Sequence, residues 1–209
     1  MSRSTEQLIA TLAADAGPVR RLRPPMIRAF GWIAAAAAVA VLAIAAFADM
    51  PGFLARAARP QLALELAATL LTALAAIVAA FHLSLPDRSR AWALLPLPPL
   101  ALWLALSGSS CLLAWARGGP TGGGAHCLMF ILAVSLPTGA LLFWSLAKAH
   151  PISPGLTAAV GGLGVAATSA FLLQFFHPFD VTITDLALHL VAVIAVVTAA
   201  STLGRRALT

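Results

Sequence analysis

Long apolar stretches between charged residues constrain this chain more than any other feature of its sequence. Six such stretches lie between Arg28 and Arg205, and each holds about 20 mostly apolar residues, the number that crosses a bilayer as an α-helix. Trimmed at glycine, proline and polar residues, they predict spans at approximately 29–48, 63–83, 96–115, 126–147, 155–176 and 185–204. The composition agrees, because 61% of the residues are hydrophobic, 10% are charged and the mean hydropathy is +0.95. The sequence therefore predicts an all-α integral membrane bundle of six transmembrane helices.

The distribution of basic residues predicts how the bundle is oriented. Of the 13 lysines and arginines, Arg56, Arg59 and Arg117 fall on one side of the predicted bundle and the other ten on the side of the amino terminus. Because cytoplasmic loops carry the excess of basic residues, both termini should be cytoplasmic. The predicted domains are a cytoplasmic segment at 1–28, a six-helix transmembrane domain at 29–204 and a cytoplasmic tail at 205–209.

The chain has two cysteines, Cys111 and Cys127, and they flank the glycine-rich segment "RGGPTGGGA". The predicted topology places both at the outer surface, which in a bacterium is the periplasm, where disulfides persist. The glycine-rich segment can bring the two Cα atoms within the roughly 5.5–6 Å that a disulfide needs. Three interpretations stay open: a redox-responsive or metal-responsive pair, a static disulfide, and two inert thiols.

Further side chains that bind metals are expected towards the same surface. They are His126, His177, Asp180, Asp185 and His189. Cysteine and histidine are the ligands that soft and borderline metals prefer, so an accessory site for a transient soft metal ion is conceivable, and no other cofactor is predicted. The spacing contains neither CxxC nor HxxxH. In the competing interpretation, His177 caps a loop and Asp185 caps the last helix.

The amino-terminal segment predicts a short helix from about Thr5 to Ala16. Ser4 and Gln7 fit a capping box, and an apolar stripe follows at helical spacing. The stripe is formed by Leu8, Ile9 and Leu12. A helix of this length is marginal alone in water, so it should dock on the bilayer, on the inner loops of the protein or in a groove of a soluble partner.

The basic segment "PVRRLRPP" follows this helix. Its arginines are Arg20, Arg21 and Arg23. They can hold the first span at the layer of lipid phosphates, or steer an acidic partner surface towards the membrane.

A stripe of small residues in the fifth predicted span indicates close packing. Its members recur every fourth residue and are Ala158, Gly162, Ala166 and Ala170. Such a face lets a neighbouring helix approach closely, so its role should be structural.

The sequence contains no catalytic motif, which predicts a non-enzymatic protein. Enzymes of thiol–disulfide exchange relay electrons between cysteine pairs, whereas this chain has one pair and no CxxC. A transporter of a small solute or an ion is the main alternative. Transport paths normally contain ionisable groups within the membrane, yet Glu65, His82, Asp185 and His189 all fall towards helix ends.

Several segments together resemble the integral-membrane anti-sigma factors called negative regulator of sigma F, NrsF. These segments are "LAADAGPVRRLRPP", "DRSRAWALLPLPPLALW", "GLTAAVGGLG", "LLQFFHPFD" and the closing "GRR". The resemblance covers nearly the whole chain. It implies a six-span protein of the bacterial inner membrane that binds an extracytoplasmic-function sigma factor on the cytoplasmic side and does not bind nucleic acid directly.

The same resemblance implies what the cysteines do. Members of the family release the sigma factor under stress from oxidants or heavy metals, and cysteines on the periplasmic side are associated with sensing. The matching residues here would be Cys111 and Cys127. With a sigma factor as the partner, the amino-terminal stripe and the basic segment are the candidate elements that bind it.

Overall fold

The computed structural model describes residues 4–16, 22–118, 126–176 and 182–208, and all the secondary structure in these ranges is helical. The elements are α1 (Thr5–Asp15), α2 (Pro25–Phe47), α3 (Met50–Ala57), α4 (Pro60–Leu83), the 3-10 helix η1 (Arg90–Leu94), α5 (Leu97–Ala116), α6 (His126–Ala147), α7 (Pro154–Leu173) and α8 (Ile183–Ala207). Six of the helices, namely α2 and α4 to α8, are long and apolar enough to cross a membrane. The predicted all-α fold class is confirmed.

Proline residues begin several of the long helices. Pro25, Pro60 and Pro154 occupy the first positions of α2, α4 and α7. A proline fits there because its missing N–H would have no helical partner and its φ is already close to the helical value. The helices α2 and α4 consequently begin three or four residues before the predicted spans, which were trimmed at these prolines and the polar residues beside them.

Two short helices lie in connections that the sequence analysis left without secondary structure. The helix α3 follows Asp49, whose side chain accepts a hydrogen bond from the main-chain N–H of Gly52 at 3.2 Å. The 3-10 helix η1 follows Ser89, whose hydroxyl accepts a hydrogen bond from the N–H of Ala91 at 3.1 Å. In both helices the side chain of the N-cap residue therefore accepts a hydrogen bond from a main-chain N–H of the first turn.

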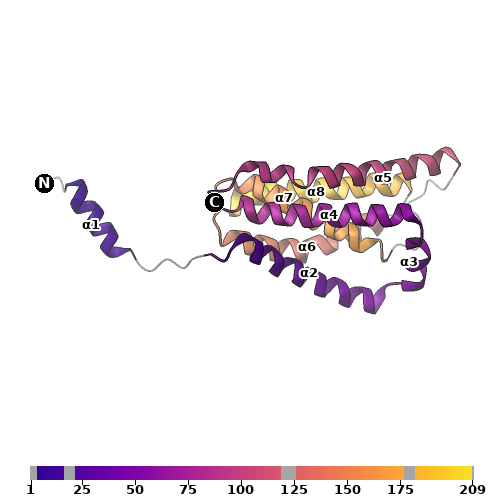
Figure 1. Ribbon diagram of the computed structural model, residues 1–209, viewed down its shortest axis with the longest axis horizontal. Helices are drawn as coiled ribbons and strands as arrows, with labels where there is room; N and C mark the ends of the chain where they lie inside the picture. Colours follow the sequence, from indigo (N-terminus) through magenta and orange to yellow (C-terminus); the bar gives the residue numbers. More distant parts are fainter. Residues whose placement is uncertain (1–3, 17–21, 119–125, 177–181, 209) are drawn as a thin grey trace.

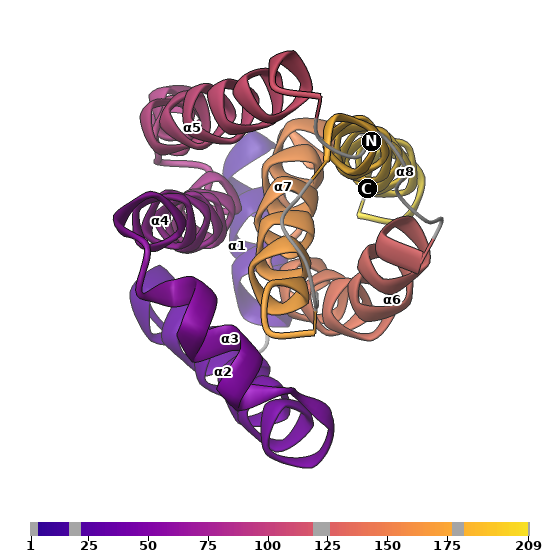
Figure 2. The same ribbon diagram turned by 90° about the vertical axis from the view of Figure 1, so that its right-hand side faces the viewer.

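The helix α7 is the centre of the bundle, with the other five long helices arranged around it (Figure 2). In its most apolar window 72% of the residues are buried, compared with 39% for α4, the next most buried span. It packs against α4, α6 and α8. A helix surrounded on all sides needs small side chains where its neighbours come close.

The predicted stripe of small residues on α7 is buried along its whole length. A Cβ atom placed on Gly162 would lie 2.7 Å from the Cβ of Ala200 in α8. On another face of the helix, a Cβ on Gly164 would lie 2.8 Å from Cδ1 of Ile77 in α4. The absence of side chains at these glycines therefore sets how closely α7 approaches its neighbours. The sequence predicted this for the face that carries Gly162 and not for the face that carries Gly164.

The two ends of the bundle carry different features (Figure 1). One end holds α3, and we call it the outer end, following the predicted topology. The opposite end holds the start of α2 and the end of α8, and we call it the inner end. The helix α1 lies apart from the bundle in Figure 1, and none of its residues is buried. Its capping box between Ser4 and Gln7 is formed as predicted.

Candidate functional site

Both cysteines lie at the outer end and bond to the beginning of α8. Cys111 is in the last turns of α5 and Cys127 is the second residue of α6. The two side chains are buried, with 2% and 4% exposed, and both are in the reduced thiol form. The Sγ of Cys111 donates to the main-chain oxygen of Thr182, and the Sγ of Cys127 donates to Oδ1 of Asp185, each over 3.6 Å. The segment 182–185 at the start of α8 is therefore contacted by both α5 and α6.

A capping box fixes the start of α8. The N–H and the hydroxyl of Thr182 donate to Oδ2 of Asp185 at 3.1 and 2.8 Å, and the N–H of Asp185 donates to the Thr182 hydroxyl at 3.2 Å. Asp185 is fully buried, and a carboxylate is stabilised at this position by the positive end of the helix dipole. Asp185 was predicted as a helix cap, but its partner Thr182 was not. The spacing T-x-x-D in "TITD" is the signal that identifies Thr182.

The predicted accessory metal ligands are only partly described. His189 is buried one turn after Asp185 on α8, and α6 begins at His126. His177 and Asp180 lie outside the described residues. Within the described ranges, no three histidine, cysteine or acidic side chains are placed to hold a metal ion. The metal site stays a prediction.

A polar cavity of about 390 Å³ opens beside Cys111 at the outer end. Its lining includes three arginines, Arg56, Arg59 and Arg117, together with Glu65. The hydroxyl of Ser110, the residue before Cys111, donates to Oε1 of Glu65 at 2.6 Å. In the sequence these arginines indicated only the orientation of the bundle. Their gathering around one cavity depends on how α3, α4 and α5 pack, which the sequence does not reveal.

The predicted partner-binding stripe on α1 is exposed. Leu8, Ile9 and Leu12 have exposed fractions of 47%, 61% and 62%. Arg20 and Arg21 of the basic segment lie outside the described residues, whereas Arg23 is described and exposed. An exposed apolar stripe on an amphipathic helix is the feature that helix-in-groove recognition uses.

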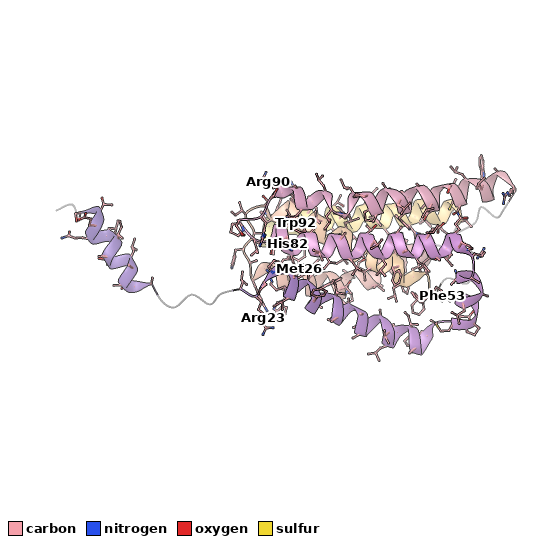
Figure 3. All side chains as sticks on the ribbon, in the orientation of Figure 1. Arg23, Met26, Phe53, His82, Arg90 and Trp92 are labelled. Carbon is pink, nitrogen blue, oxygen red and sulfur yellow. The ribbon has the colours of Figure 1, made fainter. Side chains whose placement is uncertain are left out.

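A groove at the inner end separates α2 from α6. It has a volume of about 700 Å³, and its lining includes Arg23, Arg28, Trp144 and Lys148. The ammonium group of Lys148 lies 3.2 Å from the centroid of the Trp144 ring, a cation–π contact. Figure 3 shows Arg23 at this end of the molecule, opposite Phe53.

Arg28 attaches the first span to the rest of the bundle. Its guanidinium donates to the hydroxyl of Ser84 at 3.2 Å and to the main-chain oxygen of Ser145 at 2.5 Å, and it lies 5.0 Å from the centroid of the Phe81 ring. The five donors of a planar guanidinium allow one arginine to bridge α4 and α6 in this way. Arg28 was counted in the sequence analysis only as a basic residue near the membrane surface.

His82 and Trp92 form a stacked pair at the inner end, visible side by side in Figure 3. The ring centroids are 3.9 Å apart and the ring planes differ by 8°. The stack fixes η1 against the end of α4 and thereby closes the connection between α4 and α5.

These features define a class of protein: a polytopic, all-helical membrane protein with thiols at one end and an exposed amino-terminal helix beyond the other. The model of the family NrsF, negative regulator of sigma F, matches residues 12–209, and the chain belongs to this family. No curated protein and no solved structure matches the chain. The family name implies a sigma factor as the partner and is consistent with an anti-sigma factor, which is a regulatory and not an enzymatic role.

Proposed function

We propose that this protein holds an extracytoplasmic-function sigma factor inactive at the cytoplasmic face of the bacterial inner membrane and releases it when an oxidant or a heavy-metal ion reaches the periplasmic side. The family match over residues 12–209 supports the regulatory role. The sensing step rests on one observation: Cys111 and Cys127 both bond to residues 182–185 at the start of α8. In this proposal the outer end faces the periplasm and both termini lie in the cytoplasm.

The helix α1 is the proposed element that binds the sigma factor. Its leucine and isoleucine side chains are largely exposed, and burying an apolar side chain of this size contributes about 1.5–3 kcal/mol. Arg23, between α1 and the first span, adds positive charge that would steer an acidic surface towards the membrane. Docking on a partner would also supply the stability that an 11-residue helix lacks alone.

The proposed chemical event is a change of both thiols together. A two-electron oxidant such as a peroxide takes the two S–H protons and two electrons, is reduced to water, and leaves one disulfide between Cys111 and Cys127. A soft metal ion would act in a related way, by displacing both protons and binding the thiolates. In either case Thr182 and Asp185 lose the S–H donors that they have in the reduced protein.

The helix α8 would carry this change to the inner end. Its end is packed closely on the start of α7, because a Cβ atom on Gly204 would clash with the side chain of Ala158 and lie 2.8 Å from the main-chain oxygen of Pro154. Closely packed interfaces of this kind switch between discrete arrangements more readily than they deform. A displaced start of α8 would therefore shift its far end, near the first span.

Affinity purification from native membranes in mild detergent tests the partner. Four samples are compared: the full-length protein, the protein without residues 1–28, the double variant Leu8→Ala/Leu12→Ala and the control Glu6→Gln, whose side chain projects about 200° around the helix from Leu8. Mass spectrometry should identify a sigma factor with the full-length protein and the control, and about tenfold less or none with the other two. If no sigma factor is captured in any sample, the proposal fails; equal capture in all samples removes the role of α1.

Mass tagging of thiols tests the sensor. Both thiols should be taggable after denaturation of the resting protein, and both should be protected from the tag after a peroxide treatment that releases the sigma factor. Cys111→Ser and Cys127→Ser should each abolish this release while leaving capture intact. Release that proceeds with unchanged thiols would contradict the sensing step.

A further inference from the structure

The polar cavity at the outer end has the dimensions and position of a ligand site. Its volume of about 390 Å³ falls within the range of about 300–1,000 Å³ that is usual for sites of small molecules. The start of α4, the last turns of α5 and the residue that ends α7, Gln174, surround it. Figure 1 shows α3 and these ends of α4 and α5 together at the outer end. Three separate parts of the chain thus build one concave surface.

The described lining of this cavity carries an excess of positive charge. It includes three guanidinium groups, from Arg56, Arg59 and Arg117, and one carboxylate, Glu65. The hydroxyl of Ser110 occupies one oxygen of Glu65, which weakens its ability to neutralise the arginines. The α4 helix also begins at this wall, so the positive end of its dipole adds to the attraction for an anion.

Two residues that line the cavity, Arg56 and Gln174, each have a buried polar atom without a hydrogen-bond partner among the described residues. Arg56 donates from Nη2 to the main-chain oxygen of Gln174 at 2.9 Å, but its Nε is a buried donor without an acceptor. The side-chain oxygen Oε1 of Gln174 is a buried acceptor without a donor. Buried polar groups are nearly always hydrogen bonded, so the pair indicates a ligand that both accepts and donates.

We propose that this cavity binds a phosphate-type oxyanion, either hydrogen phosphate or a phosphate ester. The oxygens of such an ion accept from Arg56, Arg59 and Arg117, which match its geometry through their paired N–H groups. In hydrogen phosphate the P–OH group supplies the donor for Gln174, and in a phosphatidylglycerol headgroup a glycerol hydroxyl supplies it. Sulfate at neutral pH has no such donor. Cys111 lines the same cavity, so a bound phosphate would cover this thiol. The site stands on this geometry and is independent of the sigma factor.

Calorimetric titration of the full-length protein in nanodiscs of phosphatidylcholine tests the proposal, with inorganic phosphate as the probe. We expect saturable binding of phosphate at one site and weaker binding of sulfate. Arg117→Gln should weaken phosphate binding about tenfold, because it removes a charge-assisted contact. Glu65→Gln should tighten binding, because it removes the opposing charge but keeps an acceptor for Ser110. Arg90→Gln at the inner end is the matched control and should leave binding unchanged.

A second arm distinguishes a free phosphate from the phosphate of a lipid headgroup. The protein is placed in vesicles of phosphatidylcholine and phosphatidylglycerol, extracted in mild detergent and weighed by native mass spectrometry. Retained phosphatidylglycerol that is lost in Arg117→Gln, without binding of free phosphate, would assign the site to the lipid. Binding of free phosphate with the pattern above would assign it to a soluble ion, and phosphate should then also slow alkylation of Cys111.

The proposal is overturned if neither probe binds, if sulfate binds as tightly as phosphate, or if Arg117→Gln and Arg90→Gln have equal effects. These measurements contain no sigma factor. Failure of the phosphate site would therefore leave the proposed anti-sigma role untouched, and the reverse also holds.

Discussion

The variant Gly162→Ala measures how much of the stability depends on the close approach of α7 and α8. The added methyl group would lie 2.7 Å from the Cβ of Ala200 and 3.3 Å from both the main-chain oxygen of Val196 and the Cα of Val197. Carbon atoms pack best at about 3.5–4.0 Å, so α8 has to retreat by roughly 1 Å at this point. The obstacle is backbone and a methyl group, neither of which can rotate away.

Two opposing effects set the size of the change. Overpacking a well-filled interior costs about 1–3 kcal/mol. Replacing glycine by alanine inside a helix returns about 0.8–1 kcal/mol in helix propensity. The expected net loss of unfolding free energy is about 1 kcal/mol, and its upper value is about 2 kcal/mol.

The assay is reversible unfolding in mixed detergent micelles, with Gly31→Ala and Gly108→Ala as matched controls. No atom lies within 4 Å of a Cβ built at either control position, so both variants should keep or raise the stability through helix propensity alone. If Gly162→Ala is as stable as the unchanged protein, the contact does not limit the α7–α8 distance. If the controls lose as much as Gly162→Ala, the effect belongs to glycine in general and not to this interface.

Three further substitutions test individual contacts. Arg28→Gln should lower the unfolding free energy by about 2 kcal/mol, because it removes charged hydrogen bonds to Ser84 and to a main-chain oxygen of α6. The same unfolding assay measures this loss. An unchanged unfolding free energy would refute the bridging role of Arg28. Asp185→Ala should cost about 1 kcal/mol, because the N–H and the hydroxyl of Thr182 lose the carboxylate that accepts from them. It should also speed alkylation of Cys127, whose acceptor it removes, and equal alkylation rates would speak against that bond. Leu208→Ala should lower the unfolding free energy by about 2 kcal/mol, because it leaves a cavity in the buried cluster that Leu208 forms with Ala29 and Trp32. A loss below the error of the assay would show that the end of α8 is not packed in this cluster.

The sequence predicted those parts of the fold that depend on local composition and periodicity. Apolar length alone located the six spans, because a helix in hydrocarbon must satisfy its own backbone and cannot be much shorter than the membrane. The capping box at Ser4 could also be predicted, because its two partners are only three residues apart in the sequence. The stripe on α7 followed from a four-residue spacing, and the buried glycine at 162 is one of its members.

The parts that the sequence did not predict depend on partners far away along the chain. Arg28 bonds to Ser84 and Ser145, which are separated from it by 56 and 117 positions along the chain. No local sequence pattern encodes such pairs. The outer cavity likewise combines α3, α4, α5 and the end of α7, so its arginines looked like separate surface charges. The box at the start of α8 differs, because its T-x-x-D spacing was present in the sequence and was overlooked.

The position of α8 is consistent with the proposed influence of thiols at one end of the bundle on a partner bound beyond the other. Its first turn accepts hydrogen bonds from Cys111 and Cys127. Leu208, which follows its last turn, belongs to the same buried cluster as Ala29 and Trp32 of α2, the span to which α1 is connected. The helix α8 thus contacts the proposed sensor residues at its start. At its end it contacts α2, the span to which the proposed binding element α1 is connected. Glycines bring α7 and α8 close together, and we infer that a change at residues 182–185 would be carried along α8 as a shift of the helix.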